Sequence, residues 1–326
     1  MEVYHMKKTN LAAFALTILL LVALVIASDG AVQGAKASLT TCSGIIIPCL
    51  FPFFVVSYLA GNLGLPAYLG SKLQTPMSLL FGTSGTGAGI FILGILGGYP
   101  LGAAVIADHI HRGDISAQEG RKLLTFCNNS GPSFLIGAIG IGVFHSAPVG
   151  VLLYGIHILS AIITGLFLSG TDTPKLSPAP ILIASANLSS ALPDAISKAA
   201  LQIVQICGYV IFFGAVAGTL ESLGVFSDFY GSIAVYTPLP LQYCRAICMG
   251  LLELGCGIGA MADAPVTAQT LTICSLLTGF GGLSVCMQTA GVLSDTDIKL
   301  RYHVLGRICC GSIGAFLTFT ISSILL

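Results

Sequence analysis

Long runs of apolar residues, separated by short polar turns, cover most of the chain. An α-helix needs about 20 apolar residues to cross the hydrocarbon core of a bilayer. Continuous apolar runs near this length cover residues 11–27, 43–60, 148–168, 201–220 and 308–326. Other apolar stretches are shorter or contain glycine and proline. The pattern predicts an all-α polytopic membrane protein with about eight transmembrane helices plus broken or re-entrant half-helices.

Composition strengthens this prediction. The 326 residues are 55% hydrophobic and 8% charged, whereas a soluble globular chain has about 25% charged residues. The 13 basic and 13 acidic side chains give a net charge of zero. Because no basic patch is present to neutralise phosphates, nucleic acid is excluded as a partner. The expected surroundings are a lipid bilayer that the chain crosses several times.

The residue types that carry enzymatic or metal chemistry form no recognisable motif. The 11 cysteines lie mostly in apolar runs, with no CxxC pair and no regular spacing to histidine. They are interpreted as small buried thiols on helices, not as a disulfide or metal framework. No Ser/His/Asp or Cys/His arrangement suggests a nucleophile. We therefore expect no enzyme, no metal and no cofactor.

Four segments follow from the pattern. Residues 1–42 form an N-terminal anchor helix and connector, in which Lys7 and Lys8 place the N-terminus on the cytoplasmic side; a cleaved signal peptide is the alternative. Residues 43–168 form a first repeat with broken helices. Residues 169–199 are a Pro/Ser/Thr-rich linker followed by an amphipathic surface helix, and residues 200–326 form a second repeat with broken helices.

Two helix-breaking sequences interrupt membrane-grade segments of the first half. One is GGYP at residues 97–100 and the other is NNSGP at residues 128–132. A break at membrane depth frees backbone N–H and C=O groups, which are tolerated only where protein or a water-lined cavity satisfies them. Residues 76–110 are too long for one crossing and too short for two, which favours a half-helix or re-entrant hairpin. Paired broken helices indicate the substrate site of a transporter.

The same arrangement recurs in the second half. FCNNSGPSFLIGAIG (126–140) aligns without a gap with LTGFGGLSVCMQTAG (277–291), so that Gly131 pairs with Gly282. Upstream, residues 98–103 pair with residues 255–260. Internal repeats of this kind build a midplane site at their interface. The sequence leaves open whether the repeat is inverted or parallel.

Helix N-termini at the breaks suggest how a ligand is held. Pro100 and Pro132 suit the first turn of the helices that follow, and Asn129 or Ser130 is placed to cap the second one. Free N–H groups and the helix dipole favour an anion there. The alternative is a kinked helix whose polar side chains satisfy their own backbone. The predicted substrate-binding residues are Gly98, Tyr99, Pro100, Asn128, Asn129, Ser130, Gly131, Ser284 and Gln288.

Glu253 is an acid inside an apolar span. An intramembrane carboxylate is a functional hypothesis by default, so Glu253 is the candidate for a coupling proton or Na⁺. The alternative is an interfacial glutamate near the end of a shorter helix. Gln288 has a similar alternative, because an interhelical hydrogen bond accounts for it as well as a ligand does.

Three motifs carry a resemblance to a known family: GGYPLGA (97–103), LLTFCNNSGPSFLIGAIGIGVF (123–144) and GFGGLSVCMQ (279–288). They resemble the YlbJ-type sporulation integral membrane proteins, within the wider group that bears the nucleoside-recognition, or Gate, domain. The chain departs from the family at Cys286, where a histidine is common, so no ligand role is assigned to that position.

The resemblance implies a fold similar to that of concentrative nucleoside transporters. It also implies a function, the transport of dipicolinic acid across the outer forespore membrane into the developing spore, by alternating access between broken helices. Dipicolinate is a flat pyridine with two carboxylates, and Tyr99 and Phe134 are placed to flank its ring. The alternatives are a carrier of nucleosides or other small polar solutes, and a sporulation membrane scaffold that transports nothing.

Overall fold

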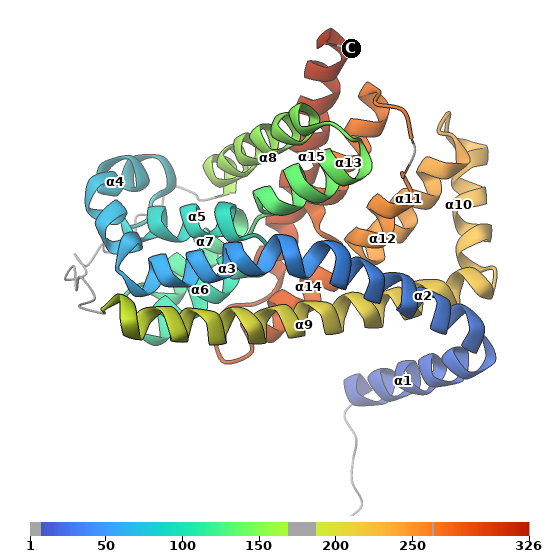
Figure 1. Ribbon diagram of the computed structural model, residues 1–326, viewed down its shortest axis with the longest axis horizontal. Helices are drawn as coiled ribbons and strands as arrows, with labels where there is room; N and C mark the ends of the chain where they lie inside the picture. Colours follow the sequence, from blue (N-terminus) through green and yellow to red (C-terminus); the bar gives the residue numbers. More distant parts are fainter. Residues whose placement is uncertain (1–7, 169–186, 263, 326) are drawn as a thin grey trace, which may run out of the picture.

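A computed structural model describes residues 8–168, 187–262 and 264–325, and every regular element in them is a helix. The first half contains α1 (Lys8–Ile26), α2 (Ser28–Thr41), η1 (Cys42–Ile46), α3 (Ile47–Asn62), α4 (Leu65–Phe81), α5 (Thr86–Gly97), α6 (Leu101–His111), α7 (Ala117–Phe126), η2 (Ser133–Val143) and α8 (Ala147–Leu168), where η marks a π-helix. The second half contains α9 (Leu188–Ser222), α10 (Val225–Tyr236), α11 (Leu241–Leu252), α12 (Leu254–Gly259), α13 (Ala268–Phe280), α14 (Gly282–Val292) and α15 (Arg301–Leu325). Figure 1 shows their arrangement.

By length and composition, five helical stretches of the described residues are able to cross a membrane, and a pair bent by 90° between α4 and α5 makes a sixth. The five are Ser28–Asn62, Ala147–Leu168, Leu188–Ser222, Ala268–Val292 and Arg301–Leu325. The all-α polytopic class is thereby confirmed. The number of full-length spans is below the predicted eight because several apolar segments, such as Ser133–Val143 and Leu241–Leu252, form helices of half that length.

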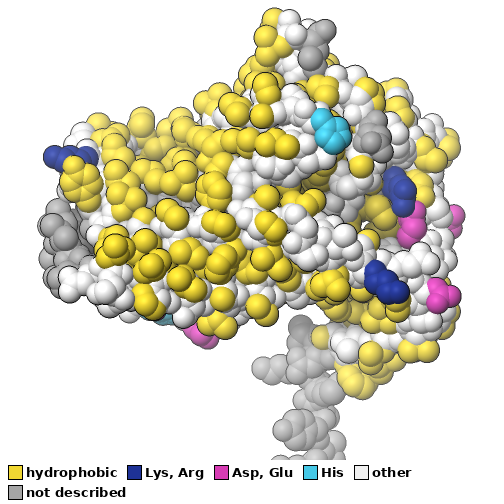
Figure 2. Space-filling view, viewed as in Figure 1, with side chains coloured by type: hydrophobic (Ala, Val, Ile, Leu, Met, Phe, Trp, Pro, Cys, Tyr) yellow, Lys and Arg dark blue, Asp and Glu magenta, His cyan; other side chains and the backbone are white. Residues whose placement is uncertain are grey.

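The outer surface suits lipid. Figure 2 shows hydrophobic side chains over most of one face, with the charged side chains near its edges. Leu79 on α4 and Phe167 on α8 are each 79% exposed, and many other large apolar side chains are exposed to a smaller extent. Such a surface is costly in water and favourable in a bilayer.

Two long helices run side by side through the molecule (Figure 1). The continuous stretch α2–η1–α3 and helix α9 each have 35 residues. They pack antiparallel, because Gly34 faces Gly218 whereas the Asn62 amide donates to the Ala191 carbonyl at 3.3 Å. A Cβ at Gly34 would lie 3.2 Å from the Cα of Gly218. Small residues let the two backbones approach, as in membrane helix pairs generally.

These long helices differ from the predicted segment boundaries. The helix continues through residue 42, where an anchor-and-connector segment was expected to end. Residues 188–199 are the start of α9, not a separate surface helix, because the same helical face continues into the buried span. The predicted linker at residues 169–186 lies outside the described residues.

The predicted repeat corresponds to the order of the helices. Helices α3 to α8 in the first half correspond to α9 to α15 in the second, and Gly64 and Gly224, with φ of 82° and 78°, occupy the same place before α4 and α10. Equivalent helices run in opposite directions, since α3 packs antiparallel to α9. In the same way α8 packs against α15, with Ser160 near Gly314. Antiparallel equivalents are the geometry of an inverted repeat.

Candidate substrate site at the paired helix breaks

The two breaks of the first half touch each other. Gly98 separates α5 from α6 and has φ of +84°, a conformation that favours glycine. A Cβ at Gly98 would lie 3.1 Å from the backbone nitrogen of Gly131, which belongs to the break between α7 and η2. Both breaks therefore exist where the sequence predicted them, and they are in backbone contact.

Asn128 joins the two breaks and reaches the second repeat. Its Oδ1 accepts a hydrogen bond from the backbone N–H of Ala103, in the first turn of α6, at 3.3 Å. Its Nδ2 donates to the hydroxyl of Thr289 on α14 at 3.1 Å. Asn128 thus acts as the cap of the helix that follows the other break.

The predicted cap of the second helix by Asn129 or Ser130 is wrong. Helix η2 begins after Pro132 with no capping side-chain hydrogen bond. The Asn129 side chain is bonded to α7 and α15 instead, and at Ser130 it is the backbone that bonds to a neighbouring helix. Asn129 donates to the Phe126 carbonyl at 2.7 Å, and the backbone N–H of Ser130 donates to Nε2 of His157 on α8 at 3.0 Å.

Arg307 on α15 binds both breaks from the side of the second repeat. Its Nη1 donates to the Tyr99 hydroxyl at 3.1 Å and to Oδ1 of Asn129 at 3.0 Å, and its Nη2 donates to the Thr125 carbonyl at 3.1 Å. The Tyr99 hydroxyl in turn donates to the Thr278 carbonyl at 3.0 Å. Arg307 is fully buried, and none of the ion pairs found among the described residues includes it.

Arg307 is not among the predicted site residues, because the last continuous apolar run begins at residue 308. In the structure α15 begins earlier, at Arg301, so Arg307 lies inside the helix. A signal was present in the sequence, since Arg307 is flanked by Leu305, Gly306 and Ile308. A charge inside a span indicates function by default.

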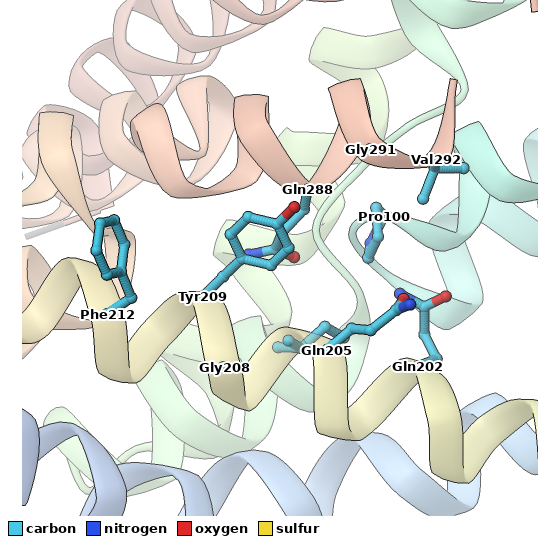
Figure 3. Close-up of a pocket in the computed structure, with 10 residues that line it drawn as sticks. Pro100, Gln202, Gln205, Gly208, Tyr209, Phe212, Gln288, Gly291 and Val292 are labelled. Carbon is cyan, nitrogen blue, oxygen red and sulfur yellow. The ribbon is translucent and has the colours of Figure 1, made fainter. Parts of the chain in front are cut away.

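A cavity of about 450 Å³ lies between α9 and α14, next to the first break (Figure 3). In Figure 3 the Gln202 and Gln205 side chains extend toward Pro100, and Tyr209 lies beside Gln288. The full lining is Pro100, Gln202, Gln205, Ile206, Gly208, Tyr209, Phe212, Gln288, Gly291 and Val292. The polar side chains of this lining are three carboxamides and one phenol, and none of the lining residues is charged.

The predicted site residues divide into three groups. Pro100 and Gln288 line the cavity. Gly98 and Gly131 form the contact between the breaks, and Ser284 accepts a hydrogen bond from Nε2 of Gln288 at 3.2 Å. The third group is absent from the cavity lining and hydrogen-bonded within the protein, and consists of Tyr99, Asn128, Asn129 and Ser130.

The aromatic rings of the cavity differ from those expected. The Tyr99 ring has the Arg307 guanidinium 5.9 Å from its centroid, and Phe134 packs against the hydrophobic core shared with the second repeat. Neither of them lines the cavity. Tyr209 and Phe212 supply its aromatic surface instead.

The second repeat has its own pair of touching breaks. Gly281 and Gly282, with φ of +84° and +81°, separate α13 from α14, and a Cβ at Gly282 would lie 2.7 Å from the Gly250 carbonyl oxygen. The other break is at Glu253, two residues before the predicted glycines. Glu253 is buried, and its Oε2 accepts from the backbone N–H of Cys256 at 2.7 Å, which caps α12.

These features define the class of the protein: a polytopic, all-α membrane protein with paired helix breaks in two antiparallel repeats and a cavity beside one pair. The comparison with known proteins agrees with this class. The chain is 28% identical over 335 residues to the sporulation integral membrane protein YlbJ of Bacillus subtilis (strain 168), an alignment that covers 94% of this chain and 81% of that protein. No family model matches the chain. The similarity along almost the whole chain supports the predicted YlbJ-type family.

Proposed function

We propose that this protein is a membrane carrier that moves a small organic anion, dipicolinic acid, into the developing spore by alternating access. The observation that carries the proposal is the cavity beside the first pair of breaks, which includes Pro100 of the break itself. Transporter sites lie where repeats meet at broken helices. The similarity to a sporulation membrane protein supports the setting, the outer forespore membrane.

The cavity suits a flat aromatic acid in size and chemistry. Its volume of about 450 Å³ lies in the range of small-molecule sites. The amide groups of Gln202, Gln205 and Gln288 supply N–H donors for carboxylate oxygens. Tyr209 and Phe212 supply apolar faces for a pyridine ring.

A nucleoside or another small polar solute is the second candidate. It is favoured by the uncharged lining, because carboxamides offer both a donor and an acceptor to the edge of a base. A membrane scaffold that transports nothing is a third possibility, and it predicts that the cavity residues tolerate substitution.

Coupling is assigned to Glu253 as part of this proposal. Its carboxylate lies buried at the break between α11 and α12, where the backbone N–H groups of Gly255 and Cys256 and the Cys256 thiol hydrogen-bond to it. A carboxylate has about four lone-pair sites, so acceptor capacity remains for a proton or Na⁺. The capping role and the coupling role are therefore compatible.

Uptake of radiolabelled dipicolinate into proteoliposomes tests the proposal. We expect saturable uptake by the wild type, indifferent to excess nucleoside and strongly reduced by Gln288→Leu. The matched control is Gln33→Leu, which changes an exposed glutamine on α2 outside the cavity.

The other outcomes separate the candidates. Equal dipicolinate counts in protein-containing and empty vesicles would reject the dipicolinate proposal. Nucleoside uptake that depends on Gln288 would then favour the second candidate. Folded protein that moves neither solute would favour the scaffold.

A further inference from the structure

Within the described part of the chain, Arg307 is a buried positive charge that pairs with no carboxylate. Arg307 has no exposed surface. Its guanidinium donates only to neutral oxygens, those of Tyr99, Asn129 and Thr125, and its Nε has no hydrogen-bond partner. The ion pairs of the described residues all lie elsewhere. Burial of such a charge is unfavourable unless something compensates it.

Helix dipoles compensate Arg307 only in part. Its Nη2 donates to the Thr125 carbonyl in the last turn of α7, where the helix dipole is negative. A helix contributes about half a negative charge at its C-terminus. Because the guanidinium carries a full positive charge, a net positive charge remains.

This charge lies close to the cavity. Pro100 lines the cavity, and the hydroxyl of the preceding residue, Tyr99, accepts a hydrogen bond from Arg307. The guanidinium is therefore about one tyrosine side chain away from the backbone of Pro100, a distance of about 10 Å. At an effective dielectric constant of about 20, two unit charges at this distance change a dissociation constant by about tenfold.

We propose that Arg307 determines the charge preference of the cavity. It acts through space as a specificity-determining residue: a ligand with carboxylates binds about tenfold or more tightly than a neutral ligand of the same shape. The carboxamides and aromatic rings of the lining select the shape of the ligand, and Arg307 selects the sign of its charge. This inference rests on the proposed function, because it takes the cavity as the substrate site.

The test compares two probes of equal shape, dipicolinate and the neutral pyridine-2,6-dicarboxamide, bound to the full chain in nanodiscs of neutral lipid. We expect the wild type to prefer dipicolinate by about tenfold or more. Arg307→Gln should abolish this preference while retaining binding of the diamide, and Arg307→Lys should restore it. Arg301→Gln is the matched control, because Arg301 is an exposed arginine at the start of the same helix.

A measurement on the wild type alone covers the case in which Arg307→Gln does not fold. A buried charge is screened little by salt, so the preference should persist in about 1 M salt, where the screening length is about 3 Å. Loss of the preference in high salt would assign it to surface charges and overturn the inference.

The remaining outcomes distinguish the two proposals. Equal binding of both probes to the wild type, or an unchanged preference in Arg307→Gln, overturns the role of Arg307 and leaves the cavity as a binding site. Absence of binding of either probe to folded wild-type protein rejects the proposed function, and the role of Arg307 is rejected with it.

Discussion

In both pairs of helix breaks the two breaks contact each other at a glycine, but the side chains at the two pairs differ. At the first pair, Tyr99, Asn128 and Asn129 bind partners in the second repeat, on α13, α14 and α15. At the second pair, Glu253 binds the chain three residues further on, and Gly282 touches the backbone near Gly250. The polar side chains of the first pair thus reach the other repeat, whereas Glu253 of the second pair bonds locally, and the second pair receives the Tyr99 hydroxyl from the first repeat at the end of α13.

This difference assigns separate tasks to the two pairs. A break whose side chain bonds to its own backbone keeps its local structure when the repeats move, so the glycine contacts of the second pair contribute mainly to the fold, while the Glu253 carboxylate keeps its proposed coupling role. A break held by side chains from the other repeat changes when the repeats move relative to each other. The first pair also borders the cavity. We therefore expect substitutions at the first pair to change both stability and uptake, and glycine substitutions at the second to change stability first.

The largest effect is expected for Gly282→Ala. The added Cβ would occupy a left-handed backbone position and lie 2.7 Å from the Gly250 carbonyl oxygen. Backbone strain and overpacking together lower the free energy of unfolding by about 3 kcal/mol. Denaturation in mixed micelles measures this change. Gly259→Ala is the control, because its Cβ would meet nothing within 4 Å; equal losses for both variants would contradict close contact at the second pair.

Asn129→Leu should follow, with a loss of about 2 kcal/mol in the free energy of unfolding. The change leaves one Arg307 donor and the Phe126 carbonyl without their partner. We expect uptake to fall as well, and the two readouts are measured on the same preparation. Asn187→Leu is the control, since that exposed asparagine makes no capping hydrogen bond. A variant with normal stability and normal uptake would show that Asn129 contributes neither to the fold nor to the substrate site.

A smaller effect is expected for Asn128→Ala, about 1 kcal/mol, because it removes the cap of α6 and the hydrogen bond to Thr289. The double-mutant cycle with Thr289→Val isolates the bond that crosses between repeats. Its coupling energy should be about 0.5 kcal/mol or more. Strict additivity of the two substitutions would show that this bond does not link the repeats.

Glu253→Gln should have the smallest effect on stability, below about 1 kcal/mol, because the glutamine oxygen still accepts from the backbone of Cys256. The coupling role predicts a different result for transport: uptake driven by an imposed proton or Na⁺ gradient should be lost. Uptake under both gradients is compared with the wild type. Normal gradient-driven uptake would leave Glu253 with its capping role alone.

Local sequence predicted the helix breaks well and the cavity incompletely. GGYP and NNSGP interrupt helices for reasons contained in the residues themselves, so the positions of both breaks were predictable. The contribution of α9 was missed, although Gln202, Gln205 and Tyr209 recur at helical spacing and indicate a polar stripe on an otherwise apolar span. The local sequence does not show which neighbouring helix such a polar stripe faces.

The amino-acid sequence by itself determined the class of the protein, its helical segments, its breaks and the correspondence between its halves. These features depend on hydrophobicity and backbone preference within short stretches. The tertiary structure alone decided which side chain forms hydrogen bonds with which helix end. Asn128 caps α6, neither Asn129 nor Ser130 caps η2, and Arg307 reaches both breaks of the other repeat. Such pairings join residues up to 208 positions apart, and only the packing of the helices brings them within hydrogen-bond distance.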